Sequence, residues 1–291
     1  MKKFYISDVP DKHTMTSWIK ENTNWIKLMQ SMRPQKTLPP LLCFKIDNFN
    51  PAELAEDIIN AMEIYGEHGW KSSGGEAKVY TGFSLVYNPN QLDNLNPHSS
   101  TLGTPQNSIN EFYWNRTENH NILKNSYFDG YGFNVPTPAS EYKSIGKFMS
   151  RGLRTRVRSR LSIINGMYSD QATRVWHKDE PIFENLRINV PITTSPHYMF
   201  DLENYPPVNL PVGKAYSWNT HIPHRVYPKD DTIDNSRRIH FVLGYSPWWN
   251  YLPDEQAWVQ NEFYGEKHPF DMLIEGDVFS GLEFDSSFSL Y

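Results

Sequence analysis

Residues 154–165 read Arg-Thr-Arg-Val-Arg-Ser-Arg-Leu-Ser-Ile-Ile-Asn, and this stretch marks a change of pattern along the chain. From Arg154 to Leu161, every second residue is an arginine, and the residues between them are Thr, Val, Ser and Leu. A period of two is typical of a β-strand, in which successive side chains point to opposite faces. The second half of the chain is therefore predicted to be built mainly from strands.

More short strands are predicted after this point. Turns such as Glu180-Pro181 and Pro206-Pro207 separate them, because proline cannot donate to a sheet ladder and fixes a turn conformation. Many short strands at close spacing are typical of a sandwich or a barrel. The strand-like runs are 161–165, 173–177, 186–193, 197–202, 213–218 and 238–245.

The N-terminal half has a different pattern, with helical spacing. Asn50 is a good N-cap and Pro51 suits the first helical position, and Leu54, Ile58 and Met62 then fall on one face. Weaker helical patterns cover residues 14–32 and begin again at Ser140, whereas 88–110 reads as a long loop. These patterns predict an α+β fold in which a mainly helical N-terminal region packs on a C-terminal jelly roll.

Composition excludes several classes of protein. The formal net charge of −5 argues against a globally basic nucleic-acid binder. No run approaches 18 apolar residues, so no transmembrane helix is expected. The single cysteine, Cys43, excludes a disulfide framework and a cysteine-based zinc cluster. We therefore expect a cytoplasmic protein with neither a membrane nor a nucleic-acid partner, in which any metal is held by histidines and carboxylates.

Three residues have a pattern that suits a metal ion. In a strand, His177 and Asp179 share a face, so the imidazole and the carboxylate can converge on one ion. His224 lies 47 residues later and directly follows Pro223, which favours an extended start for a strand. For this reason His224 is preferred over its neighbour His221 as the third ligand. Two histidines and one carboxylate form the facial triad of non-haem Fe(II) enzymes, although a solvated or hydrogen-bonded His177 is the simpler interpretation of this motif alone.

The segment Arg237-Arg238-Ile239-His240-Phe241 is predicted to be a strand, because β-branched and aromatic residues favour one. One of its two arginines must point inward. A buried arginine needs an anion, since an unpaired buried cation is costly, and its planar guanidinium suits a carboxylate. Strand parity alone does not decide between Arg237 and Arg238.

Four segments, in order, resemble the aspartyl/asparaginyl β-hydroxylase type of Fe(II)/2-oxoglutarate oxygenase. In that family, a strand of the form Arg-x-His-x-Pro follows the first metal ligand, and a His-x-Val segment precedes an Arg-hydrophobic-His-hydrophobic strand. The resemblance covers about residues 160–247. The segments are Val175-Trp176-His177-Lys178-Asp179, Leu186-Arg187-Ile188-Asn189-Val190-Pro191-Ile192, His224-Arg225-Val226 and Arg238-Ile239-His240-Phe241-Val242.

The resemblance implies a double-stranded β-helix, which is a cupin-like jelly roll with iron at one mouth. We expect this catalytic core at 151–250, with a mainly helical and loop region at 1–150 packed on it and a C-terminal extension at 251–291. By resemblance, His177, Asp179 and His224 are the iron ligands.

The resemblance also implies 2-oxoglutarate as co-substrate. Arg238 maps to the residue that binds its distal carboxylate, Arg187 and Asn189 map to the same cavity, and Ser162 maps to a serine that supports the co-substrate carboxylate. Asn189 departs from the family, which commonly has a histidine there. The implied activity is an oxygenase reaction, with molecular oxygen, that hydroxylates a free amino acid or an aspartyl- or asparaginyl-type side chain of a peptide or protein.

Two other functions fit parts of the pattern. A non-redox metal cupin, such as an isomerase, would use the same ligands without needing a buried arginine. A non-catalytic jelly-roll module could instead bind a partner through the arginine strip 151–160, which we interpret as the solvated face of an edge strand. If Ser162 faces inward, however, parity puts Arg158 and Arg160 on the same side, where they would favour an acidic substrate.

Overall fold

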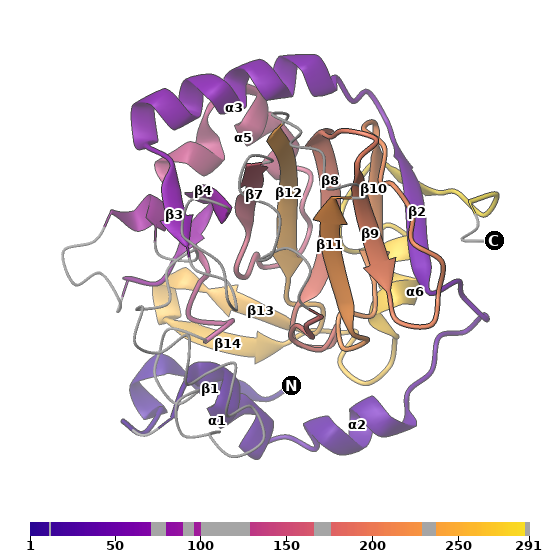
Figure 1. The fold of residues 1–291 in the computed structure, drawn as a ribbon. Coiled ribbons are helices and arrows are strands. Elements are labelled where there is room, and N and C mark those ends of the chain that lie inside the picture. Colours follow the sequence, from indigo (N-terminus) through magenta and orange to yellow (C-terminus); the bar gives the residue numbers. More distant parts are fainter. Residues whose placement is uncertain are drawn as a thin grey trace.

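The computed structural model describes residues 1–11, 13–70, 80–89, 96–99, 129–165, 176–228 and 237–288. These residues form a mixed α/β structure dominated by antiparallel sheets (Figure 1). The predicted mixture of helices and antiparallel strands is therefore confirmed. Within the described ranges, no helix combines the length and the apolar character needed to cross a membrane.

The main sheet has eight strands in the order β15-β2-β10-β8-β12-β7-β4-β3, and each paired neighbour runs antiparallel. The sequence positions of its strands are scattered, so the chain crosses the sheet repeatedly. Its strands are β2 (Leu41–Ile46), β3 (His68–Trp70), β4 (Tyr80–Ser84), β7 (Arg160–Asn165), β8 (Leu186–Thr193), β10 (Lys214–Trp218), β12 (Arg237–Tyr245) and β15 (Leu282–Phe284).

Three smaller sheets and five α-helices complete the described structure. The small sheets pair β9 (Tyr198–Leu202) with β11 (His224–Pro228), β5 (Val86–Tyr87) with β6 (Val135–Pro136), and β14 (Ala257–Gln260) with both β1 (Lys3–Tyr5) and β13 (Trp249–Leu252). The helices are α1 (Met15–Glu21), α2 (Trp25–Ser31), α3 (Pro51–Tyr65), α5 (Lys143–Met149) and α6 (Pro269–Ile274).

Most of the predicted strands are present within one residue of their expected bounds. The runs 161–165, 186–193, 197–202, 213–218 and 238–245 correspond to β7, β8, β9, β10 and β12. The prediction for 173–177 falls partly outside the described residues, and His177 itself forms an isolated bridge with His224.

The alternating stretch before Arg160 is not a regular strand, which corrects the interpretation of residues 154–159. Arg156 makes only an isolated bridge to Tyr245, and Arg158 has a left-handed φ of 48°. A residue in that conformation breaks the pleat, because an extended strand requires a negative φ. The period of two in the sequence therefore begins six residues before the strand does.

We expected the arginine strip 151–160 to be the solvated face of an edge strand, and this expectation is wrong. β7 lies between β12 and β4, inside the main sheet. Arg151 donates to the carbonyl oxygens of Asp47, Ser280 and Gly281, so it ties the C-terminal segment to the sheet rather than facing solvent with its neighbours. The strip is divided among different contacts and does not form one basic surface.

Residues before 150 contribute more strand than the helical patterns predicted. The helix at Asn50 is confirmed as α3, whose Glu53 N–H donates to the Asn50 side chain at 3.3 Å, and whose Leu54 and Ile58 are buried. In addition, β2, β3 and β4 join the main sheet, as does β15 from the segment after 250. The three-part division of the chain stays a prediction about domains, and the main sheet draws strands from all three parts.

The two faces of the main sheet have different roles. On β8, Leu186, Ile188, Val190 and Ile192 point into the larger apolar core, which α3 and α5 help to cover (Figure 1). The opposite face carries the alternate residues of the same strands. There, β9 and β11 pack over β2 and β10 through a second apolar cluster of Leu41, Cys43, Phe200, Leu202, Leu210, Tyr216 and Trp218.

Candidate metal centre

His177, Asp179 and His224 come together on this second face. One potential ligand atom from each residue lies within 4.8 Å of the others. The Asp179 Oδ2 atom is 3.4 Å from His224 Nε2, and the Asp179 backbone N–H donates to the carbonyl oxygen of Thr220 at 2.9 Å. Two imidazoles and one carboxylate on two adjacent extended segments can hold a divalent transition metal and leave other positions open.

Local structure orients the His224 ring. Its Nδ1 lies 2.9 Å from the Ile222 carbonyl oxygen, which can only accept, so Nδ1 carries a proton and Nε2 is the nitrogen that faces Asp179. The ring is buried and packs against Phe200 and Trp218, with centroid distances of 6.2 and 5.4 Å. His221, the competing candidate, is exposed and lies outside the group of three.

Electrostatics keep the Asp179 carboxyl ionised. Burial alone would raise its pKa, but Arg187, His224 and His177 together hold the pKa well below its usual range. The largest of these opposing influences is Arg187, which donates one terminal N–H to Asp179 and the other to Glu180. An ionised carboxylate beside two imidazoles is the protonation state that metal binding requires.

Glu180 is a member of this site that the sequence analysis missed. Its Oε1 accepts from Arg158 at 2.5 Å, and its backbone carbonyl accepts from the Thr220 hydroxyl at 2.5 Å. Burial raises its pKa, but Arg158 and Arg187 outweigh this and lower the pKa to about 2. Its position directly after the His-x-Asp motif was the available signal.

The predicted co-substrate residues also lie on this face of the sheet. Arg187 and Asn189 alternate with the core residues of β8, and Ser162 alternates with the core residues Leu161 and Ile163 of β7. The ladder between β12 and β7 sets His240 opposite Ser162, and Arg238 opposite Ile164.

The register answers the question that parity left open. Arg238 is only 8% exposed and lies on the second face, whereas Arg237 is exposed and pairs with Glu67 at the surface. Arg160 shares the second face with Ser162, and burial, followed by the charges of Arg187 and Arg158, lowers its pKa to about 9.

Arg238 is a buried cation without an acidic partner in the described part of the chain. Among those residues, no carboxylate oxygen lies within 4.0 Å of its guanidinium, and its one hydrogen bond goes to His240 Nδ1 at 3.0 Å. Burial lowers its pKa to about 10. Because Nδ1 accepts, His240 carries its proton on Nε2.

Two further donors on this face have no partner among the described residues. The buried Nε2 of His240 and the buried Nδ2 of Asn189 make no hydrogen bond there. Buried donors without partners cost free energy, on the order of 1–3 kcal/mol each. Together with Arg238, they form a set of donors that an anionic ligand with several acceptor oxygens would satisfy.

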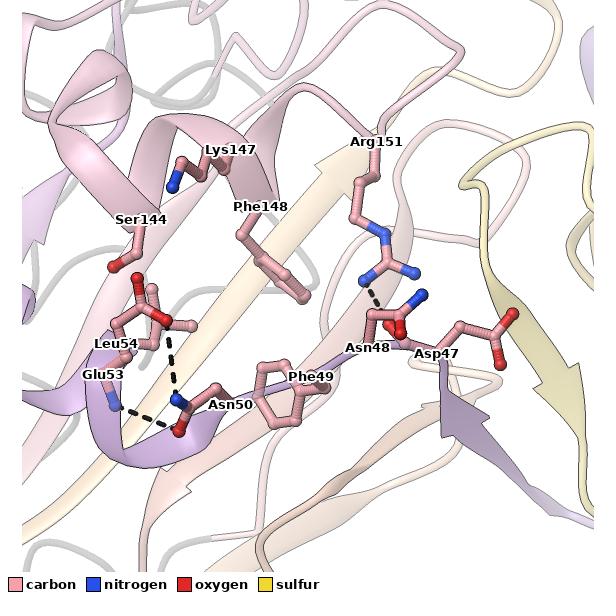
Figure 2. A pocket seen from close by; sticks show the side chains of 10 residues that line it. All are labelled: Asp47, Asn48, Phe49, Asn50, Glu53, Leu54, Ser144, Lys147, Phe148 and Arg151. Atoms are coloured by element: carbon pink, nitrogen blue, oxygen red, sulfur yellow. Dashed lines mark hydrogen bonds between the residues drawn. The ribbon is translucent and has the colours of Figure 1, made fainter.

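The cavity drawn in Figure 2 lies at a different place, where α3 begins beside α5. It has a volume of about 380 Å³, and Phe49, Leu54 and Phe148 form part of its wall. Two of its polar side chains have local partners: the Asn50 side chain caps α3, and Arg151 binds backbone carbonyls. None of the three candidate metal ligands lines it.

Comparison with known proteins gives distant structural similarity. No family model and no curated protein matches the chain. Solved structures with a similar arrangement include an oxidoreductase of the 2OG-Fe(II) oxygenase family from Burkholderia pseudomallei, with 14% identity over 67% of this chain and 79% of that one and a TM-score of 0.34. At such a low TM-score the similarity does not assign a function.

Two more solved structures are similar to the same degree. The non-heme alpha-ketoglutarate-dependent epimerase SnoN from nogalamycin biosynthesis is 11% identical over 71% of this chain and 77% of its own, with a TM-score of 0.36. A candidate oxygenase from Shewanella oneidensis is 14% identical over 72% of this chain and 83% of its own, with a TM-score of 0.35.

Proposed function

We propose that this protein is an Fe(II)/2-oxoglutarate-dependent oxygenase that hydroxylates an amino acid or an aspartyl- or asparaginyl-type side chain. The observation that carries the proposal is the buried Arg238, which shares the face of the metal centre and has no carboxylate partner among the described residues. A dicarboxylate co-substrate would supply the missing partner of Arg238, because one end of it would chelate the metal and the carboxylate at the other end would pair with the guanidinium.

The donor set of the site fits Fe(II). His177, Asp179 and His224 supply two neutral nitrogen ligands and one negative oxygen ligand, a combination found in non-haem iron oxygenases. With Fe(II) and 2-oxoglutarate bound, the site supplies the oxidation of a C–H bond by molecular oxygen, coupled to the conversion of 2-oxoglutarate into succinate and carbon dioxide. The fold that carries these ligands is proposed to be a double-stranded β-helix with its core at 151–250.

The chain's own residues hold the co-substrate in this proposal. Arg238 pairs with the distal carboxylate of 2-oxoglutarate, and Ser162, which faces His240 across the ladder, supports the same carboxylate. Asn189 offers its free Nδ2 donor to the co-substrate, although it cannot carry a proton charge as a histidine would. Arg187, held by Asp179 and Glu180, closes the metal end of the same face.

A non-redox metal cupin is the second candidate, because it would use the same three ligands. It has no need for a buried cation at Arg238, and that residue favours the oxygenase. A binding module that uses the arginine strip is less well supported, since Arg151 and Arg158 are engaged in contacts within the protein.

An anaerobic titration tests the proposal. The protein is loaded with Fe(II), 2-oxoglutarate is added, and the metal-to-ligand charge-transfer absorption of the chelate is followed, before air is admitted and succinate is measured. We expect saturable chelation and slow succinate formation even without substrate. Metal binding without any 2-oxoglutarate affinity would favour the non-redox cupin, and binding of neither would leave only a binding module.

A further inference from the structure

The residues behind the metal centre form a continuous ionic chain. Arg158 donates to Glu180 Oε1, Arg187 donates to Glu180 Oε2 and to Asp179 Oδ2, and that same Oδ2 lies 3.4 Å from His224 Nε2. Both carboxylate oxygens of Glu180 are thus occupied by different guanidinium groups. This ionic chain therefore connects Arg158, in the arginine strip 151–160, to the Asp179 oxygen that faces the metal position.

Most of this ionic chain is buried. The side chains of Arg187, Glu180 and Arg158 are 5%, 17% and 16% exposed, so water does little to screen their charges. Arg187 uses its two terminal nitrogens on two neighbouring carboxylates, which fixes the plane of its guanidinium. Asp179 accepts a hydrogen bond from a nitrogen in that plane. The orientation of Arg187 therefore decides how the Asp179 carboxylate faces the metal position.

We infer that Glu180 is a positioning residue for the metal ligand Asp179 and that it acts through Arg187. Glu180 accepts one of the two hydrogen bonds that the Arg187 terminal nitrogens donate, so that Arg187 orients Asp179 while it is shared between two carboxylates. Without Glu180, the whole charge of Arg187 would fall on Asp179 and would compete with a divalent metal for the same oxygen. This inference rests on the proposed function only in requiring that Asp179 ligates a metal.

A neighbouring residue provides a matched control. Glu184 is also a buried acid, but its ion pair is with Lys20, and the terminal nitrogens of Arg187 donate to Asp179 and Glu180 instead. Glu180→Gln and Glu184→Gln each remove one buried negative charge from the same segment of chain, four residues apart. A role in general packing would be visible in the thermal stability of both variants, whereas a positioning role requires a change at the metal for Glu180 alone.

Co(II) is a suitable probe, because its visible absorption reports the ligand geometry. We expect Glu180→Gln to weaken Co(II) binding by roughly 10- to 100-fold, the range typical of residues that orient metal ligands, and to change the absorption spectrum. Glu184→Gln should keep the parent's affinity and spectrum. Glu180→Asp keeps the charge but loses reach, so it should lie between the parent and Glu180→Gln, and it serves if the Gln variant does not fold.

The outcomes separate this inference from the proposed function. If the parent binds Co(II), His177→Ala does not, and the Glu180 variants match the parent in affinity and spectrum, the positioning role is wrong while the metal centre stands. If the parent does not bind Co(II), or His177→Ala binds it equally well, the metal centre itself is wrong and Glu180 loses its role with it.

Discussion

The backbone groups of His177 and His224 exchange both of their hydrogen bonds, with N–O distances of 3.1 and 3.0 Å. Such a doubly bonded antiparallel pair holds its two Cα atoms about 5.5 Å apart. The imidazole centroids are 4.5 Å apart, although the residues are separated by 47 positions in the sequence. An isolated antiparallel bridge in the backbone therefore brings the two candidate ligands together.

The histidines can be tested individually. His177→Ala and His224→Ala should each abolish stoichiometric binding of Fe(II), because two protein ligands hold the ion too weakly for a stable site. His221→Ala should keep it, since that side chain is exposed and lies outside the group. Metal content after anaerobic loading and desalting is the measurement. Loss in His221→Ala with retention in His224→Ala would show that the third ligand has been misassigned.

Two arginines of the 154–160 stretch should behave differently. Arg158→Gln removes one partner of Glu180, so it should destabilise the fold and weaken metal binding, because breaking one side of a buried ion pair costs about 3–5 kcal/mol. Arg156→Gln is the control, since the structure gives Arg156 no ion pair among the described residues. Urea denaturation and Co(II) titration of both variants provide the comparison, and equal behaviour of the two would argue against a special role for Arg158.

The pH dependence of stability follows from two buried acids with opposite pKa shifts. The folded-state pKa of Glu180, about 2, lies below its ordinary value, so its contribution is present at neutral pH and is lost as the pH falls from about 4.5 towards 2. Burial raises the pKa of Glu184, so its contribution is present at low pH and is lost as the pH rises.

Replacement by glutamine removes each contribution. Glu180→Gln should therefore make stability fall less steeply between about pH 4.5 and pH 2, relative to the parent. Glu184→Gln should not change the fall of stability in this acidic range, and it should reduce the loss of stability at higher pH. Chemical denaturation at a series of pH values checks both, and an unchanged acid limb in Glu180→Gln would mean that Glu180 is not held ionised by its arginines.

Much of the second half of the fold could be predicted from the sequence, because its strands alternate core and site residues. On β8, the apolar residues Ile188 and Val190 frame Asn189, and that local pattern fixes which side chains share a face. The local pattern does not indicate which of the two faces carries the candidate metal centre. For this reason, the choice between Arg237 and Arg238 needed the register of β12 against β7 and β8.

The unpredicted features depend on contacts between distant residues or on backbone conformation. β2 joins the main sheet through its pairing with β10, more than 160 residues later in the sequence, and its short apolar run has no helical or alternating signal. The left-handed φ of Arg158 interrupts a perfect alternation. Arg158 also pairs with Glu180, which lies 22 residues later, and neither feature could be read from the pattern of residues.

Arg238 gives the sharpest test of the proposed co-substrate. Arg238→Met keeps most of the side-chain volume but removes the charge that would pair with the distal carboxylate. The loss of about 3–5 kcal/mol expected for breaking such a buried pair corresponds to a fall of roughly two to three and a half decades in the affinity for 2-oxoglutarate. Fe(II) binding should persist, because no ligand has changed, and Arg237→Met should have little effect, because Arg237 is exposed.

Without co-substrate, the same substitution should stabilise the protein. Arg238 is a buried cation with no carboxylate partner among the described residues, so the ligand-free protein carries its desolvation cost. Arg238→Met should therefore raise the melting temperature of the ligand-free protein while it abolishes the further stabilisation that 2-oxoglutarate gives the parent. Thermal melts with and without 2-oxoglutarate, in the Fe(II)-loaded parent and both Met variants, measure these two effects. If 2-oxoglutarate stabilised Arg238→Met as much as the parent, Arg238 would not be its anchor, and the non-redox cupin would become the better account of the site.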